Sequence, residues 1–404
     1  MDPIVGIVFV LVYTGMFLGE LPRLRLDRAG IALVGAIALV VTGRINTAAA
    51  WGAIDVPTIL LLTALMIVSG QLRLSGFYTI VTQRLVEANH SPMVFLALII
   101  ATAGVLSAVL ANDIVCLAMA PLLVAACARR SLDPIPYLLA LACASNVGSA
   151  ATLIGNPQNM LIGQTLGLSF TRYLVEGGPP AIAGLLVIWI VIVFVYRGRW
   201  TRETAYADPH AIPIDRWQVG KGLTVVVGIV LAFLLTPWPR EVVALAGAAL
   251  LMVSRKMASR AMLAQIDWHL LVLFVGLFVV NRAVAQAGLV SYYLMLSRMM
   301  GVDVTSPPIL FAGTAVLSNI VSNVPAVMLL LPAARTEIAG PILALASTFA
   351  GNLLIVGSIA NIIVVDQARQ HGQVIKARTH ARVGIPVTVM TLAVAALWLW
   401  VLSA

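Results

Sequence analysis

The sequence carries little charge. Asp, Glu, Lys and Arg together make up 10% of its 404 residues, whereas soluble domains have about 25%. Hydrophobic residues account for 61% and occur in runs long enough to cross a bilayer. The composition therefore excludes a soluble fold. It predicts an all-α polytopic membrane protein that is surrounded by the lipid bilayer.

Several chemical motifs are also missing. The chain has no G-x-x-x-x-G-K-[ST] phosphate loop, so an ATP site is not expected. It has no G-x-S-x-G or H-E-x-x-H motif, and its five histidines form no metal-binding pattern. We therefore expect no enzyme activity and no cofactor. The three cysteines lack C-x-x-C spacing and are predicted to be packing residues.

The apolar runs predict about ten transmembrane helices. Two further apolar stretches, 92–129 and 304–334, are interrupted in the middle, which favours re-entrant hairpins. The first run has no basic residue before it and no cleavage site after it, so it is interpreted as a spanning helix and not as a signal peptide. The predicted single spans are 3–20, 28–43, 56–73, 135–168, 178–197, 217–235, 240–253, 267–285, 339–370 and 382–402.

The basic residues gather on one side of these spans. With the hairpins counted as non-crossing, 19 of the 25 Lys and Arg residues fall on one side and 6 on the other. The positive-inside rule then places the larger group in the cytoplasm and both termini outside, in the cell inner (plasma) membrane. This distribution accounts for the net charge of +9 without a nucleic-acid partner.

The two halves of the chain resemble each other in sequence. Matching residues occur in the same order at a nearly constant offset of about 210 positions, which indicates an internal duplication. The matched pairs include Gly35 and Gly247, Asp55 and Asp267, Gly76 and Gly288, Asn112 and Asn323, Gly155 and Gly357, and Asn159 and Asn361.

The duplication defines the predicted domains. Residues 1–200 form the first repeat, 201–216 a cytoplasmic linker and 217–404 the second repeat. Each repeat has five crossings and one hairpin, and this odd number turns the second copy upside down. Inverted repeats with interrupted helices are typical of secondary transporters, with the binding site between the repeats.

One polar segment interrupts the middle of a predicted helix in each repeat. SNVGSAATLIGNPQN, from Ser145, lies within 135–168, and ASTFAGNLLIVGSIAN, from Ala346, lies within 339–370. Gly and Pro in these segments permit the helix to unwind, and the Asn, Ser and Thr side chains can satisfy the freed backbone groups. We predict two helices broken in the middle of the membrane, each opposite a hairpin tip.

Such breaks expose the ends of half-helices. Their N-termini carry partial positive charge and suit an anion, whereas C-terminal carbonyls with Asn and Ser oxygens suit a hard cation such as Na⁺. The segments are therefore interpreted as a binding site for an anion and a coupling cation. The alternative is that they are small polar residues that pack helices together.

Asp113, at the first hairpin tip, is the acid placed deepest in the apolar sequence. Three roles are open to it: ligand of a cation, carrier of a transported proton, or member of a structural ion pair. Its counterpart in the second repeat is Val324, so the two tips differ chemically. Asp55 and Asp267 begin helices and are predicted to be N-caps.

The break and tip motifs resemble those of the ion transporter superfamily, which includes citrate-transporter-like permeases, divalent anion:sodium symporters and arsenite permeases. ATLIGNPQN is similar to the break motif of the superfamily, and LANDIVCLAMAP is closer to the hairpin of the arsenite (ArsB-type) permeases. The resemblance implies a scaffold domain, a moving transport domain with an elevator mechanism, and a homodimer.

The resemblance also assigns site residues by position. The superfamily holds substrate carboxylates with Ser, Asn and Thr at the tips, and here the first tip keeps only Asn112 and the second only Ser322 and Asn323. The residues expected to bind substrate are Asn112, Asp113, Asn156, Asn159, Ser322, Asn323, Ser358 and Asn361. Those expected to bind the cation are Asn112, Asp113, Ser145, Asn146, Gly155, Asn323, Ser347, Thr348 and Gly357.

Together these features predict a secondary active transporter of a small anion such as a dicarboxylate, citrate or an oxyanion. The expected coupling ion is Na⁺ or H⁺, and Na⁺ is the one metal ion expected. The alternative is a Na⁺/H⁺ antiporter or an arsenite-type export permease in which Asp113 carries the ion or proton.

Overall fold

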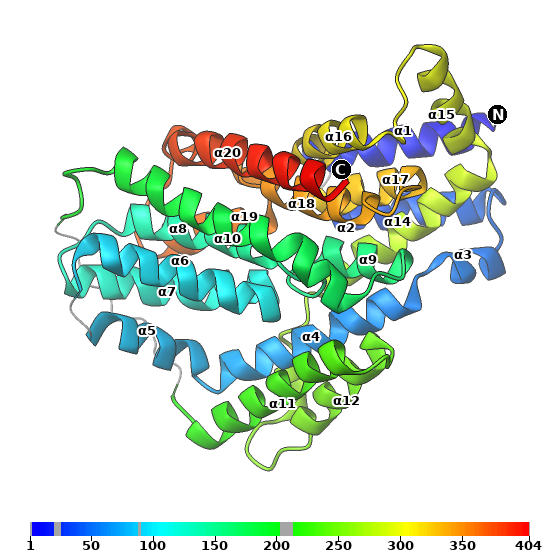
Figure 1. Ribbon diagram of the computed structural model, residues 1–404. Helices are drawn as coiled ribbons and strands as arrows, with labels where there is room; N and C mark the ends of the chain where they lie inside the picture. Colours follow the sequence, from blue (N-terminus) through cyan, green and yellow to red (C-terminus); the bar gives the residue numbers. More distant parts are fainter. Residues whose placement is uncertain (1, 20–25, 88–89, 203–212, 404) are drawn as a thin grey trace.

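The computed structural model describes residues 2–19, 26–87, 90–202 and 213–403, and in these residues it is all-helical (Figure 1). Helices follow one another without a β-strand, and an isolated bridge pairs Leu132 with Thr201. The predicted all-α class is thereby confirmed. Most of the linker predicted at 201–216 lies outside the described residues.

Seven of the described helices are long and apolar enough to cross a membrane. Several further apolar helices are shorter, so the expected number of about ten spans stays a prediction. The seven are α4 (Val56–Leu74), α6 (Pro92–Val109), α7 (Asn112–Arg129), α10 (Phe170–Val195), α11 (Arg216–Leu235), α14 (Trp268–Gln286) and α20 (Ala377–Ser403).

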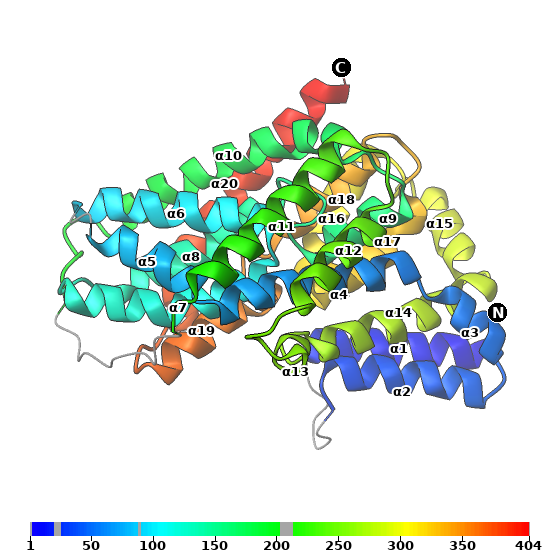
Figure 2. The ribbon, with the colours of Figure 1, turned by 90° about the horizontal axis from the view of Figure 1, so that it is seen from below.

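Two groups of three helices each combine two helices from one half of the chain with one helix from the other half. In the first group α1 (Pro3–Leu18) and α2 (Arg28–Val41) pack against α14. In the second group α11 and α12 (Arg240–Met252) pack against α4. Because each group takes two helices from one half and the third from the other, the halves are interlocked. The two groups lie side by side in Figure 2 and meet where α4 contacts α14.

The remaining long helices form a bundle beside these groups (Figure 1). α6 and α7 both pack against α8, and α16 packs against α17 and α18. The helices of the two halves meet in this bundle where α10 packs against α20 and where α19 packs against α7 and α8. The bounds are α8 Pro134–Ser149, α9 Pro157–Thr165, α16 Pro307–Val321, α17 Asn323–Leu330, α18 Ala339–Ala350 and α19 Ile359–Gln370.

Short helices connect the longer ones in the same order in both halves. α5 packs against α4, α6 and α7, whereas α15 packs mainly against α14 and projects from the body in Figure 1. The two halves therefore have the same element order but different packing. The short helices are α3 (Thr47–Ala53), α5 (Phe77–Glu87), α13 (Ser259–Leu263) and α15 (Leu289–Met299), with 3₁₀ turns at Leu331–Ala333 and Ile355–Gly357.

α10 begins earlier than the span predicted at 178–197, because Pro179 and Pro180 do not end it. A proline inside a helix leaves the carbonyl four residues before it without a partner. For Pro180 this is the carbonyl of Glu176, which accepts a hydrogen bond of 2.8 Å from Nε1 of Trp398 in α20. A contact from a distant helix thus compensates for the lost intrahelical hydrogen bond, and α10 continues through both prolines.

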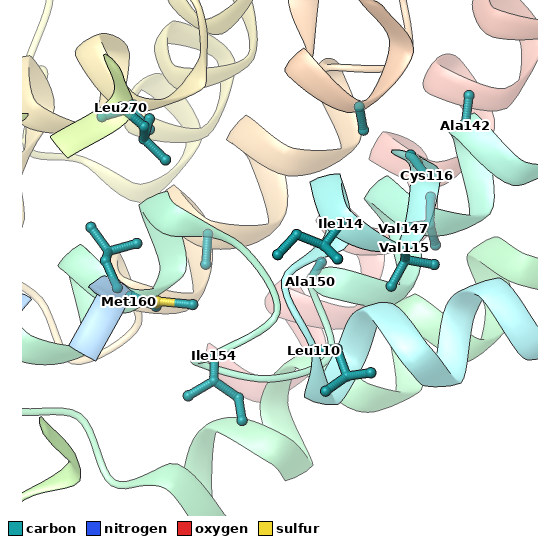
Figure 3. Close-up of a cluster of buried hydrophobic side chains, with 14 of the residues drawn as sticks. Leu110, Ile114, Val115, Cys116, Ala142, Val147, Ala150, Ile154, Met160 and Leu270 are labelled. Atoms are coloured by element: carbon teal, nitrogen blue, oxygen red, sulfur yellow. The ribbon is translucent and has the colours of Figure 1, made fainter. Parts of the chain in front are cut away.

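The core around the first hairpin is closely packed. Leu110, Val115 and Val147 are at most 3% exposed, and Figure 3 shows them in one cluster with Ala150. The three cysteines are fully buried, as predicted. α6 and α8 cross at their glycines, because a Cβ atom on Gly148 would lie 2.4 Å from the Cα and carbonyl oxygen of Gly104.

Gly148→Ala is expected to lower the free energy of unfolding by roughly 1–3 kcal/mol, because the added methyl group forces α6 away from α8. The measurement is thermal unfolding of the purified protein in detergent. Gly178→Ala is the control, since a Cβ atom there has open space and alanine favours the helix. An unchanged midpoint for Gly148→Ala would contradict this account of the crossing.

Candidate functional site

The first predicted break is a non-helical segment between α8 and α9. α8 ends at Ser149 and α9 begins at Pro157, whose missing N–H is harmless at a first helical position. The side chain of Asn156 caps α9 by accepting from the N–H of Asn159 at 2.9 Å. The amide of Asn159 donates to the carbonyl of Thr152 at 2.9 Å. Asparagines therefore satisfy the backbone that unwinding exposes.

The second break is built in the same way between α18 and α19. α18 ends at Ala350, and α19 begins at Ile359 after a single 3₁₀ turn. The amide of Asn361 donates to the carbonyls of Gly351 at 2.9 Å and Leu354 at 3.2 Å. Asn361 is the sequence counterpart of Asn159, so the duplicated residues perform the same structural task.

The two breaks are hydrogen-bonded to each other. Asn146, in α8, donates to the side-chain oxygens of Asn352 at 2.8 Å and Asn361 at 3.2 Å, and it accepts from Ser358 Oγ at 2.8 Å. We call these contacts, together with those of Thr348 described next, the break junction. Asn146 is 1% exposed, so its hydrogen bonds are made away from solvent.

Thr348 completes the junction with contacts from the second half to the first break. It lies in α18 at the position that corresponds to Asn146, and its hydroxyl accepts from Asn156 at 3.3 Å and from Gln158 at 3.1 Å. Each half therefore sends one side chain from its first half-helix to the start of the second half-helix in the other half. Sequence comparison identified Thr348 and Asn156, but it missed Gln158.

The first hairpin tip is attached to the first break. The N–H of Asn112 donates to the carbonyl of Gly155 at 3.3 Å, and Ser145 Oγ donates to the carbonyl of Asn112 at 3.2 Å. A Cβ atom on Gly155 would lie 2.3 Å from the carbonyl oxygen of Ser149 and 2.6 Å from that of Ser107. Only glycine fits here, and several carbonyl oxygens converge on this point.

The second tip repeats this attachment. When its side-chain amide is oriented to donate, Asn323 reaches the carbonyls of Ser347 at 3.0 Å and Gly357 at 3.3 Å. Ser322, which precedes it, has a φ of 75°. This conformation is uncommon for a residue other than glycine and is often found at functional sites. The tips and breaks predicted from the sequence thus come together, although the binding roles of their residues stay predictions.

Asp113 lies in the first turn of α7, where it is half-buried. In the described part of the chain it makes no ion pair and no side-chain hydrogen bond, so its structural-pair role finds no partner there. It lines a cavity of about 40 Å³ that also contacts Asn156 and Asp267. Asp267 caps α14 through the N–H of Leu270 at 3.0 Å, as predicted. Its position in this cavity was not predicted.

Further polar contacts around the breaks were not predicted from the sequence. The hydroxyl of Tyr173 donates to the carbonyl of Ala150 at 2.9 Å, and a ring nitrogen of His380 lies 3.0 Å from the carbonyl of Asn352. Tyr173 and His380 lie just before the spans predicted at 178–197 and 382–402, near the starts of α10 and α20. Their contacts depend on how α10 and α20 pack, which no local motif signals.

A larger cavity, of about 770 Å³, lies away from the break junction. It is bounded by the loop before α4, the end of α9, the start of α10 and the connection between α11 and α12, and it includes Arg240 and Glu241. No hairpin tip residue lines it. Size alone does not make it the site, because the duplicated polar residues converge elsewhere.

Comparison with known proteins identifies relatives over nearly the whole chain. The sequence profile of the family described as "Citrate transporter" matches residues 9–341. A "46 kDa membrane protein" of Mycobacterium leprae is 28% identical, covering 93% of this chain and 94% of its own. A "Silicon efflux transporter" of Oryza sativa subsp. japonica is 28% identical over 87% of each chain. The solved YdaH transporter of Alcanivorax borkumensis is similar in fold, with a TM-score of 0.59 at 14% identity, covering 98% of this chain and 96% of that one.

A double-mutant cycle tests the break junction. Asn146→Ala and Ser358→Ala are expected to be non-additive by about 0.5–3 kcal/mol, because each removes the same 2.8 Å hydrogen bond. The measurement is the free energy of unfolding in mixed detergent. Asn146→Ala combined with Thr224→Ala is the control, since the Thr224 hydroxyl bonds within its own helix α11. If the changes in the free energy of unfolding for Asn146→Ala and Ser358→Ala are additive, the hydrogen bond between these two side chains contributes no coupling energy.

Proposed function

The chain belongs to the citrate transporter family of membrane transporters, and we propose that it is a secondary active transporter of a small anion coupled to Na⁺ or H⁺. The observation that carries this proposal is the break junction, in which two interrupted helices share buried polar side chains. Each hairpin tip is attached to one of these breaks. Such a cluster provides helix ends for both an anion and a cation.

The anion would be held by the N-terminal ends of the half-helices. α7, α9, α17 and α19 begin at the tips and breaks, and their first backbone N–H groups lack intrahelical partners. Dicarboxylates, citrate and oxyanions are the proposed class of substrate. No Lys or Arg is among the residues of the break junction, so binding would rely on N–H groups, asparagines and a bound cation.

The energy for accumulation would come from the coupling ion. One charge that moves through 100 mV provides roughly 2.3 kcal/mol, which supports about 50-fold accumulation. We propose that the two three-helix groups act as the scaffold and that the hairpins and broken helices move against them as an elevator. A homodimer and an inner-membrane orientation with both termini outside are part of the same proposal.

Export is the second candidate. It is favoured by the similarity to a silicon efflux transporter and by Asp113, which is well placed to carry a proton or cation through the bundle. In this version the chain would move Na⁺, H⁺ or a neutral or anionic oxyacid outwards, and anion binding would not require a cation gradient.

Flux in proteoliposomes separates these candidates. Uptake of dicarboxylates, citrate, sulfate or arsenite is expected to require an imposed Na⁺ or H⁺ gradient. Asp113→Asn is expected to reduce gradient-driven uptake at least about tenfold, because it removes the charge that interacts with the coupling ion.

Asp366→Asn is the matched control, since Asp366 is an exposed acid near the end of α19 whose contact is with Gln370. Its uptake should match that of the wild type. Na⁺-driven proton movement that needs no anion and is lost in Asp113→Asn would contradict symport and establish the antiporter.

A further inference from the structure

A small cavity joins the first hairpin tip to the second half of the chain. It is lined by Asn112 and Asp113 of α7, by Asn156 at the start of α9, and by Gln265 and Asp267 just before α14. Apolar side chains of α4, α7 and α9 complete the lining, including Ile114 and Met160, which are labelled in Figure 3. Two aspartates from different halves therefore line one small cavity, with Asp113 half-buried and Asp267 exposed.

Several oxygen acceptors of this cavity have no donor. Asp113 makes no hydrogen bond or ion pair with any residue that the structure describes. Asn112 is 5% exposed, and its Oδ1 is buried without a hydrogen-bond partner. Asp267 uses one carboxylate oxygen, Oδ1, to cap α14, which leaves the other oxygen available. Asn112 Oδ1 is thus a buried acceptor without a partner, which is costly and calls for a ligand that can satisfy it. The half-buried Asp113 and the exposed Asp267 lie beside it in the lining of the same cavity.

The neighbouring donors are already engaged. The Asn156 amide donates to Ser149 Oγ at 2.8 Å and to Thr348. The guanidinium of Arg73 donates to Oε1 of Gln265 at 3.0 Å, and within the described ranges it makes no ion pair with either aspartate. Negative charge in the cavity is thus left without a protein counter-charge in contact.

We propose that this cavity binds a single small cation, with Na⁺ as the matching ion, and that Asp267 supplies the second carboxylate of the site. This inference rests on the proposed function, because it names where the coupling ion sits. An all-oxygen donor set suits a hard cation. A volume of about 40 Å³ exceeds the roughly 10–15 Å³ that one water needs, yet it is too small for an organic anion.

The position of the ion gives it a mechanical role. Asp113 and Asn112 belong to the hairpin tip that contacts the first break, whereas Asp267 belongs to the helix group of α1, α2 and α14. A cation bound between them contacts both the hairpin and that group, and it must part from Asp267 when the hairpin carries it away. The second repeat has Val324 in place of Asp113, so only the first tip provides a carboxylate for this contact.

Direct binding of ²²Na⁺ to the purified full-length chain in choline buffer tests the site. Wild type should bind the ion saturably, and Asp113→Asn should abolish binding. Asp267→Asn should raise the Kd at least about tenfold, because ligand charge governs affinity in oxygen sites. Asparagine is as good an N-cap as aspartate, so α14 should still form. If Asp267→Asn does not fold, Asp267→Ser replaces it, since serine also caps helices.

Asp55→Asn is the matched control. Asp55 is the repeat counterpart of Asp267 and caps α4 through the N–H of Thr58 at 3.0 Å, but it does not line this cavity. Its Kd for Na⁺ should stay within about twofold of wild type. Comparing Asp267→Asn with Asp55→Asn thus distinguishes the effect of changing a helix cap from the effect of removing a cation ligand.

Two results would overturn the inference. If Asp267→Asn binds Na⁺ as wild type does while Asp113→Asn does not, Asp267 is no ligand. If wild type binds no Na⁺ although anion uptake follows a proton gradient, the cavity is not a Na⁺ site, and the transporter proposal stands. Na⁺ binding that depends on both aspartates, in a protein that moves no anion, would support the site and refute the proposed function.

Discussion

Backbone N–H and C=O groups inside a membrane must find partners within the protein, and the rest of this structure depends on that constraint. Both interrupted helices leave such groups exposed in the middle of the bundle. Asn159 and Asn361 satisfy the carbonyls within each break, and Asn146 and Thr348 join one break to the other. Neither half completes its polar contacts alone.

The duplication gives both halves the same framework, but they use it differently. Each tip is attached to its own break through an asparagine, Asn112 in one half and Asn323 in the other. The first tip adds a carboxylate where the second has Val324. The first half packs its short connecting helix, α5, against its hairpin, whereas α15 packs mainly against α14. The features that both halves share therefore build the site, and the features found in the first half make its two sides chemically different. This division suits a protein in which an anion and a cation occupy neighbouring but different positions.

Much of this arrangement could be predicted from the sequence, because Gly, Pro and Asn are conspicuous in an apolar chain. The two helix pairs and the breaks lie at the predicted residues, and α6 with α7 fills 92–129 apart from the tip. That these pairs are re-entrant stays a prediction. The start of α10 was predicted too late, since the carbonyl freed by Pro180 is satisfied by Trp398 from a distant helix. The partners of Asn146 and the cavity position of Asp267 depend on the register between the halves, which local patterns do not encode.

The central claim is that the transported anion binds between the tips and the breaks, and cysteine protection tests it most directly. Ser322→Cys places a thiol at the half-buried second tip, while the native cysteines are fully buried and should react slowly. The rate of alkylation by a small thiol reagent would be measured in proteoliposomes with and without the transported anion. The account predicts that the anion, together with its coupling ion, slows alkylation. An equal rate at saturating anion would contradict it.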